Sequence, residues 1–230
     1  MGKNKLARFT QLATYSHVLQ PHKDEVLGGF PMAGKWKSDF FKNNQPLVVE
    51  LGCGRGEYAV ALGQRDPQKN YLGIDIKGAR IWEGATHSLQ EDMAHVGFLR
   101  TRIEWVEHCF APGEIDEIWI TFPDPQIKFQ RAKHRMIGPA FLEKYERLLS
   151  PGGAIHLKSD SEFLHGYLHG IIEWKGLEVL EAYHDIYGQI VDKPDHVVFA
   201  CKTFYEKMWL KQGKTITYLK FRFLKGGGVK

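Results

Sequence analysis

A glycine-rich turn behind an acidic residue is the part of this sequence with the clearest chemical meaning. The stretch Val48-Val49-Glu50-Leu51-Gly52-Cys53-Gly54-Arg55-Gly56 joins a short apolar run, the acid Glu50 and the alternating glycines Gly52, Gly54 and Gly56. Glycine permits positive φ and close approach of a ligand, and the amides of a following helix point toward that ligand. A dinucleotide fingerprint would place its third glycine one residue later, where Glu57 stands. The spacing argues against NAD and leaves another nucleotide-like ligand or a plain strand-turn-helix connection.

A second acid, Asp75, stands at the carboxyl end of the apolar strand predicted over residues 70–74. A carboxylate in that place can accept both hydroxyls of a ribose. It follows the glycine turn by about 20 residues, the usual separation within one β-α-β unit. The alternative role for Asp75 is a helix N-cap, which is common at a strand-to-helix turn.

A third acid, Asp124, lies between two prolines in the loop after the strand predicted over residues 115–121. Ligands of open α/β sheets bind beyond the carboxyl ends of the strands, so Asp124 is expected beside the site of Glu50. The next run, residues 128–135, carries four positive charges, one histidine and no acid. A phosphate backbone would fit this run, and a solvated loop is the alternative. Its cations are Lys128, Arg131, Lys133 and Arg135.

Length and composition fit one sizeable α/β domain of 230 residues with 43% hydrophobic content. The net charge of +4 permits a polyanionic partner without requiring one. Three widely spaced cysteines, Cys53, Cys109 and Cys201, suit a reduced cytosolic protein and form no CxxC pair, so no metal is expected. No signal-peptide core and no apolar run of about 18 residues is present, which predicts a cytoplasmic protein without a membrane span.

Strands and helices are expected to alternate through most of the chain, which is typical of a mostly parallel sheet covered on both faces. The expected strands are 47–51, 70–74, 97–101, 115–121 and 154–158, and the expected helices are 56–63, 77–93, 103–110, 138–149 and 161–175. Further strands over 177–187, 197–203 and 215–223 should follow one another, with an antiparallel pair closing the sheet edge. The fold class is therefore α/β, with a Rossmann-like, mostly parallel sheet.

One domain is expected over residues 45–225. Residues 1–44 are predicted to be a partly flexible N-terminal arm, and residues 226–230 a flexible tail. The cations Lys3, Lys5 and Arg8 could make this arm basic, but a frayed terminus is the favoured interpretation.

The pattern Glu-x-Gly-x-Gly-x-Gly, from Glu50 to Gly56, resembles the cofactor loop of class I S-adenosylmethionine (SAM) methyltransferases. In those enzymes the acid faces the methionine end of the cofactor. The resemblance implies that SAM is held by this loop and by Asp75, and that the sheet of the Rossmann-like fold is seven-stranded.

Further motifs resemble those of the bacterial tRNA (guanine-N7-)-methyltransferase family, also called the TrmB family. Phe122-Pro123-Asp124-Pro125-x-x-Lys128, followed by the basic loop, is similar to its signature after the fourth strand. Lys158-Ser159-Asp160, with Phe163 and Tyr167 behind it, is similar to the family's Lys-Thr-Asp motif. Thr203-Phe204-Tyr205-Glu206 is similar to its Thr-x-x-Glu motif. The match spans about residues 46–223, with the motifs in order.

This resemblance implies transfer of the SAM methyl group to N7 of guanine 46 in the variable loop of tRNA. Relatives usually have an aspartate beside the adenine of the cofactor where this chain has Arg102. Arginine cannot accept a bond from the adenine amino group, so backbone groups at Arg102 and Ile103 are expected to bind it.

The reaction needs no strong base, because guanine N7 carries a free lone pair. Catalysis then consists of orienting the base and favouring its developing positive charge. Asp160 is the candidate for holding the guanine edge, with Thr203 and Glu206 beside it. Asp124 is expected to serve the amino group of SAM and the floor of the base pocket, and Lys128 to contact the substrate. A helix N-cap is the alternative role for Asp160.

Two other functions remain open at this point. One is a SAM-dependent methyltransferase that acts on another RNA base or on a small molecule. The other is a non-catalytic RNA-binding protein with the same fold. The sequence leaves the oligomeric state open between monomer and homodimer.

Overall fold

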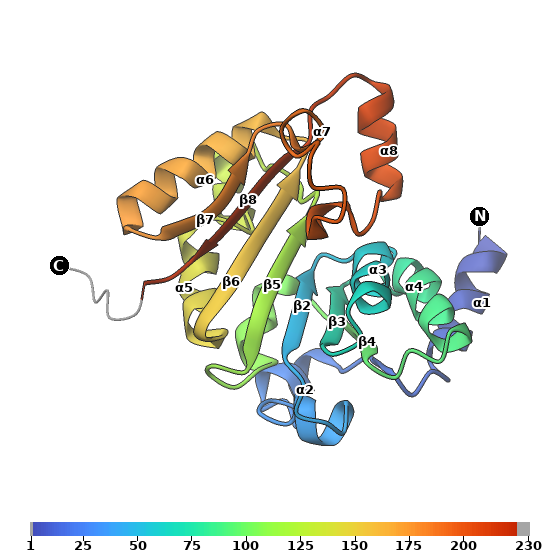
Figure 1. Cartoon of the computed structure of the whole chain (residues 1–230). Helices are drawn as coiled ribbons and strands as arrows, with labels where there is room; N and C mark the ends of the chain where they lie inside the picture. The colour runs from blue at the N-terminus through green and yellow to red at the C-terminus, as the bar shows by residue number, and fades with distance from the viewer. Residues whose placement is uncertain (1, 225–230) are drawn as a thin grey trace.

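A single eight-stranded sheet runs through the computed structural model, which describes residues 2–224. Its strand order is β1-β4-β3-β2-β5-β6-β8-β7, and helices cover both faces (Figure 1). This confirms the α/β class and the mostly parallel sheet. The tail predicted over residues 226–230 lies outside the described residues. Within residues 2–224 no helix combines the length and the apolarity needed to cross a membrane.

The centre of the sheet is parallel, as predicted. Its strands are β2 (Leu47–Leu51), β3 (Asn70–Asp75), β4 (Val96–Arg100), β5 (Ile115–Thr121) and β6 (Leu149–Ser159). Leu51 pairs with Ile74 on one side and with Ile120 on the other, and Ile120 pairs with Leu157. The carboxyl ends of β3, β2, β5 and β6 therefore meet at one edge, where residues that follow these strands come together.

Helices between the strands pack against the sheet and form one hydrophobic core with it on each face. The helices are α3 (Glu57–Arg65), α4 (Gly78–Gln90), η2 (Ile103–His108), α5 (Pro139–Leu148) and α6 (Glu162–Lys175). Side chains alternate along β5: Ile118 and Ile120 enter the core with Tyr145, whereas Trp119 enters the other core with Tyr58. A strand buried on both faces reads as a continuous apolar run, which is why these strands could be recognised.

The C-terminal strands β7 (Glu178–Tyr183) and β8 (Thr217–Arg222) are antiparallel, as predicted, and β8 lies between β6 and β7. The strand predicted over 197–203 is wrong. This segment instead forms the 3₁₀ turn η4 (Val197–Phe199) and a loop, between the short helix α7 (Ile186–Gln189) and α8 (Phe204–Lys211). The Val198 carbonyl accepts hydrogen bonds from Lys158 Nζ and from the Tyr58 hydroxyl, so side chains replace a strand partner.

The N-terminal segment adds the strand that the sequence did not predict. It contains α1 (Gly2–Leu12), β1 (Val18–Leu19), α2 (Lys23–Leu27), η1 (Trp36–Phe40) and the loops between them. β1 pairs in parallel with β4, so the sheet has eight strands instead of seven. Leu12 and Trp36 are fully buried, and Trp36 Nε1 donates to the Cys109 carbonyl. The domain boundaries near residues 44 and 225 stay predictions.

Candidate active site

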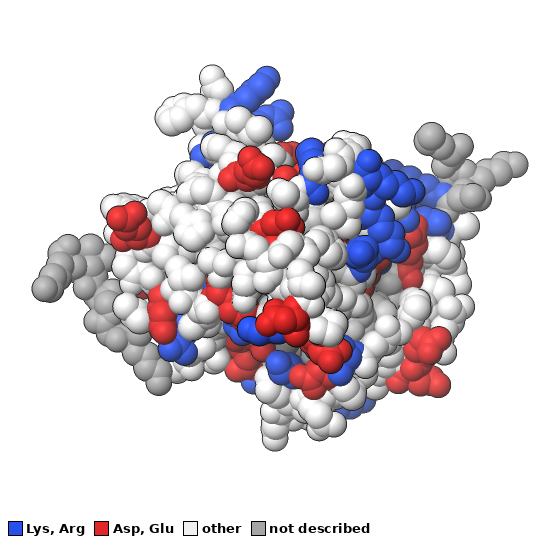
Figure 2. Space-filling view, turned by 45° about the horizontal axis from the view of Figure 1, so that its top comes forward, with Lys and Arg blue, Asp and Glu red and all other residues white. Residues whose placement is uncertain are grey.

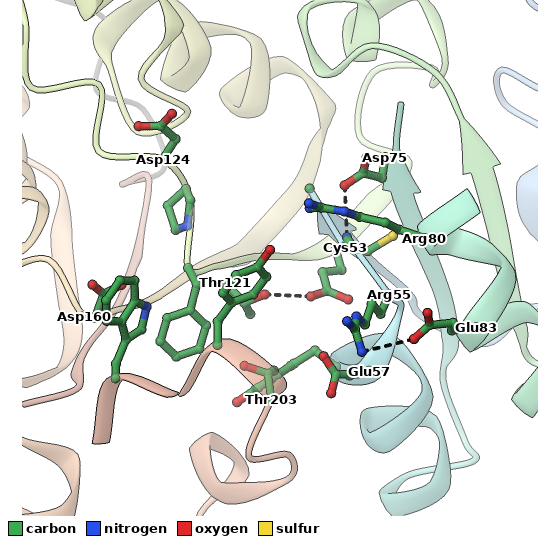
Figure 3. A pocket seen from close by; sticks show the side chains of 18 of the residues that line it. Cys53, Arg55, Glu57, Asp75, Arg80, Glu83, Thr121, Asp124, Asp160 and Thr203 are labelled. Carbon is green, nitrogen blue, oxygen red and sulfur yellow. Dashed lines mark hydrogen bonds and ion pairs between the residues drawn. The ribbon is translucent and has the colours of Figure 1, made fainter. Parts of the chain in front are cut away.

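One cavity of about 790 Å³ opens at the carboxyl edge of the sheet and joins the predicted motifs (Figure 3). Figure 3 places Asp75 on one side of it and Asp124 and Asp160 on the other. Of the predicted site residues, those that line the cavity are Glu50, Gly52, Gly54, Asp75, Asp124, Asp160 and Thr203. The others, namely Gly56, Arg102, Lys128, Arg131, Lys133, Arg135 and Glu206, do not line it.

The glycine turn has the backbone that only glycine adopts without strain. Gly52, Gly54 and Gly56 have φ of +76°, +55° and +71°. A Cβ on Gly54 would meet nothing within 4 Å, because this residue borders the open cavity. A Cβ on Gly56 would lie 2.6 Å from the Phe98 ring, and Gly56 also lies against Gly84 of α4. Gly54 thus leaves room for a ligand, whereas Gly56 allows α3 and α4 to pack closely.

Glu50 lies buried at the floor of the cavity. Its Oε2 accepts from the Ala59 backbone amide at 3.0 Å, and its Oε1 accepts from the Thr121 hydroxyl at 2.7 Å. Burial raises the pKa of Glu50 to about 8, although both hydrogen bonds act in the opposite direction. A cationic group that entered the cavity would favour the carboxylate form of Glu50.

Asp75 is oriented by two backbone amides. Its Oδ2 accepts from Gly54 at 3.0 Å and its Oδ1 accepts from Lys77 at 2.7 Å. Lys77 is the N-cap of α4, so the N-cap alternative for Asp75 is wrong. Each carboxylate oxygen has a second lone pair that can accept a hydroxyl from the cavity.

The loop that carries Asp124 is held in an uncommon conformation. Phe122 and Gln126 both have φ of +48°, a region that residues other than glycine rarely adopt. The Phe122 amide donates to the Lys158 carbonyl at 2.8 Å, and Asp124 Oδ1 accepts from the Gln126 amide at 3.1 Å. The first contact joins the loop to β6, and the second lies within the loop itself.

Arg135 holds the same loop from outside. Its guanidinium donates to the carbonyls of Gln126 and Ile127, each at 3.1 Å, and lies over the rings of Phe163 and Tyr167. Arg135 is buried, which differs from its predicted role as an RNA-binding residue. The sequence showed its charge but not these partners. Lys128, Arg131 and Lys133, in contrast, are exposed on or beside the turn η3 (Phe129–His134).

Asp160 follows β6 and faces the cavity. Ser161 is the N-cap of α6, with its hydroxyl accepting from the Leu164 amide, so the N-cap alternative for Asp160 is wrong. Asp160 Oδ2 pairs with Lys214 Nζ at 3.1 Å, and its side chain is only 15% exposed. Asp160 lines the cavity, and so does Lys214, which contacts it.

Glu206 is fully buried, which differs from its predicted contact with the substrate. It pairs with Lys158 Nζ at 2.8 Å and accepts from the Tyr187 hydroxyl at 2.7 Å. Burial lowers the pKa of Lys158, and the charge of Glu206 opposes this effect. The pair joins the end of β6 to α8. Glu206 therefore positions the cavity wall instead of lining it.

Thr203 is the N-cap of α8, and its hydroxyl accepts from the Glu206 amide at 3.2 Å. The sequence Thr-x-x-Glu is a helix-start signature, so this helix could have been predicted from it. The cavity residues that the sequence analysis missed include Arg8, Arg55, Glu57, Arg80, Glu83, Thr121, Tyr205, Trp209 and Lys214. Arg55, Glu57 and Thr121 adjoin the predicted motifs, whereas Arg8, Arg80 and Glu83 come from the distant helices α1 and α4.

Arg102 lies away from the cavity lining. Its guanidinium pairs with Glu104 at 3.5 Å and lies over the Trp105 ring. The binding of adenine by backbone groups at Arg102 and Ile103 stays a prediction.

Charge is unevenly distributed over this face. Figure 2 shows Lys and Arg side chains gathered at the upper edge and, in a larger group, on the side where Figure 1 places α1. Acidic side chains are scattered over the rest of the view, mostly below these groups. Among residues 2–224, no group of three or more His, Cys, Asp or Glu side chains is placed to hold a metal ion.

Residues 44–219 match a protein family described as "Putative methyltransferase". A tRNA (guanine-N(7)-)-methyltransferase of Christiangramia forsetii is 49% identical over 96% of this chain and 98% of its own length. One of Porphyromonas gingivalis is 50% identical over 91% of this chain and 86% of its own. The chain belongs to the tRNA (guanine-N(7)-)-methyltransferase family. Within this family member, the sequence motifs that suggested the relationship surround one cavity.

Solved structures with low sequence identity share the fold of this tRNA (guanine-N(7)-)-methyltransferase family member. The 16S rRNA methyltransferase KamB has a TM-score of 0.57 at 11% identity, covering 78% of this chain and 88% of its own. A mutant 16S rRNA (adenine(1408)-N(1))-methyltransferase from Catenulisporales acidiphilia, solved with SAM, has a TM-score of 0.57 at 13% identity, covering 85% and 93%. They confirm the Rossmann-like methyltransferase fold.

Proposed function

We propose that this protein transfers the methyl group of SAM to N7 of a guanine in tRNA, at position 46 of the variable loop. The names of its relatives support the reaction. The single observation that carries the proposal here is the shared cavity. It places the glycine turn and Asp75, which suit a nucleoside, opposite Asp160, which suits a base edge.

The cavity residues fit SAM. The open space beside Gly54 lets a ligand reach the backbone, and Asp75 can accept the two ribose hydroxyls. Glu50 can pair with the cationic amino-acid end, with Asp124 across the cavity from Asp75. When bound, SAM supplies a methyl group activated by its positively charged sulfur.

The side of the cavity with Asp160 suits guanine. Asp160 can accept from the N–H groups of the guanine edge, and Thr203 also lines the cavity. N7 has no proton to lose, so the protein needs to orient the base and favour its developing charge. The Asp160 carboxylate supplies that electrostatic contribution.

The exposed cations Lys128, Arg131 and Lys133 follow the Asp124 loop and supply charge for phosphates of the RNA. Proteins read RNA mainly at unpaired or splayed bases, and a variable loop provides such bases. A tRNA substrate supports the predicted cytoplasmic location of the enzyme.

The test is incubation of purified protein with methyl-labelled SAM and unmodified tRNA, followed by nucleoside mass spectrometry. We expect 7-methylguanosine, and none from a tRNA transcript with adenine at position 46. Asp160→Asn should lower the rate by about 100-fold because it removes the charge that favours the cationic purine. Label in a different nucleoside, or none despite SAM binding, would contradict the proposal.

A further inference from the structure

Lys214 occupies a cation site that the cavity itself provides. Its Nζ lies 3.8 Å from the centroid of the Trp209 ring and 3.1 Å from Asp160 Oδ2. All three residues line the cavity. An aromatic face on one side and a carboxylate on the other bind a positive charge through the ring quadrupole and through direct ion pairing.

The proposed reaction creates a second cation that fits such a site. The N7 lone pair forms the new N–CH₃ bond, the S–CH₃ bond breaks, and its electron pair remains on sulfur. The purine therefore gains one positive charge, spread over a flat ring. A flat cation stacks on an indole better than the neutral base does.

We propose that Trp209 and Asp160 together form the site for the purine as it becomes cationic, and that Lys214 fills this site until the base displaces it. This inference rests on the proposed function. Trp209 is thereby assigned as a stacking residue and Lys214 as a displaceable competitor of the base.

The two partners of the Lys214 side chain are held in place by the fold, whereas the Lys214 side chain itself can move away from them. Trp209 belongs to α8, which the buried Lys158–Glu206 pair anchors to β6. Asp160 follows β6 directly. Lys214 lies in the connection after α8 with its side chain 43% exposed, and its flexible stem can turn toward water.

The experiment measures binding of 7-methylguanosine monophosphate and of GMP to the protein by calorimetry, without SAM. We expect the methylated nucleotide to bind roughly ten-fold tighter, because only it carries the ring charge. Trp209→Leu should remove most of this preference, and Trp209→Phe should keep part of it. Lys214→Met should tighten binding of both nucleotides because it empties the site.

A matched control is present at the end of α6, where Lys175 Nζ lies 5.2 Å from the Trp174 ring, outside the cavity. Trp174→Leu and Lys175→Met should change neither affinity. Thermal unfolding of each variant checks that it is folded, and Trp209→Phe serves as the test if Trp209→Leu is not.

Equal affinity of the wild-type protein for the two nucleotides would overturn the inference, as would a preference that survives Trp209→Leu. Weaker binding by Lys214→Met, or no binding of either nucleotide at millimolar concentration, would also overturn it. Mass spectrometry of tRNA treated with the wild-type enzyme separates this failure from failure of the proposed function. If 7-methylguanosine forms, only the role given to Trp209 and Lys214 is wrong.

Discussion

Two glycines of the turn have different roles, since Gly54 leaves room for a ligand and Gly56 allows close packing. Substitutions can separate these roles. Gly54→Ala should cost only about 1 kcal/mol of stability, from strain at positive φ. It should nevertheless abolish detectable SAM binding, because the alanine side chain would enter the cavity. Gly56→Ala should cost more, about 3 kcal/mol, because its Cβ would overlap the Phe98 ring. Urea unfolding and calorimetric titration with SAM measure the two effects.

The order of these two costs is the decisive outcome. If Gly54→Ala destabilised the protein more than Gly56→Ala, the assignment of close packing to Gly56 would be wrong. If Gly54→Ala bound SAM normally, the ligand would not approach the turn at this residue.

Glu50 should make stability depend on pH. Its folded pKa, about 8, lies above the ordinary value of 4.5, so the folded state keeps a proton that the unfolded state has lost. The free energy of unfolding should fall as pH rises from about 4.5 to about 8, by on the order of 5 kcal/mol. The Glu50→Gln variant lacks this titration. Its melting temperature should therefore rise relative to that of the wild type as the pH increases through this range.

Thermal unfolding of both proteins at pH 5 to 9 measures this difference. In the Glu50→Gln variant the new side-chain oxygen can still accept from the Ala59 amide, while the new NH₂ group faces the Thr121 hydroxyl, so the comparison preserves the local contacts. A constant difference in melting temperature across the range would show that Glu50 is ionised throughout.

The site residues that could be predicted are those whose role depends on neighbouring residues in the sequence. The spacing of the glycines placed the turn, and the strand end placed Asp75. Arg135 and Glu206 are buried, which neither the basic run nor the motif resemblance indicated. Their partners, among them Phe163 and Lys158, stand far away in sequence, and only the folded chain brings them together.

The elements that carry the base side of the cavity depend on a buried ion pair. Glu206→Gln should destabilise the protein by about 3–5 kcal/mol, because Lys158 would keep a buried charge without its counter-charge. The double variant Lys158→Met with Glu206→Gln should recover part of this loss. Urea unfolding gives both values.

A matched exposed pair serves as the control. Glu178 and Arg222 join β7 to β8 at 2.6 Å but remain partly exposed, so Glu178→Gln should cost less than about 1 kcal/mol. If Glu206→Gln were as mild as Glu178→Gln, the buried pair would not hold α8 in place.

Elements were predictable where their pattern was long or continuous. The central strands are apolar on both faces, and the β-α-β alternation predicted that they run parallel. A short apolar run such as residues 197–203 does not distinguish a strand from a buried turn, because side-chain donors can satisfy its carbonyls. The two-residue strand β1 carries too few residues for any periodic signal.

For the molecule as a whole, RNA binding should depend on salt through the exposed basic turn. Replacing Lys128, Arg131 and Lys133 together by alanine should reduce the slope of log K against log salt by roughly 2 to 3, since each phosphate contact contributes about 0.7–0.9. Filter binding of tRNA across a salt series gives the slope. SAM affinity should stay unchanged, because none of the three lines the cavity.

The control replaces Lys23 and Lys35, which are exposed and precede β2 in the chain. Their removal should leave the slope nearly unchanged, although the net charge falls. If both sets of substitutions lowered the slope equally per charge, the RNA would respond to total charge and not to the basic turn.

The position of β8 between β6 and β7 has a consequence for the nascent chain. β7 meets its sheet partner only when residues 217–222 have left the ribosome, after all the other strands of the sheet have emerged. The N-terminal segment also cannot pack until later residues emerge, because Trp36 donates to the Cys109 carbonyl and β1 pairs with β4. Until then β7 and β1 lack their strand partners and the side chain of Trp36 lacks its core, so we expect the growing polypeptide to expose apolar surface that chaperones bind.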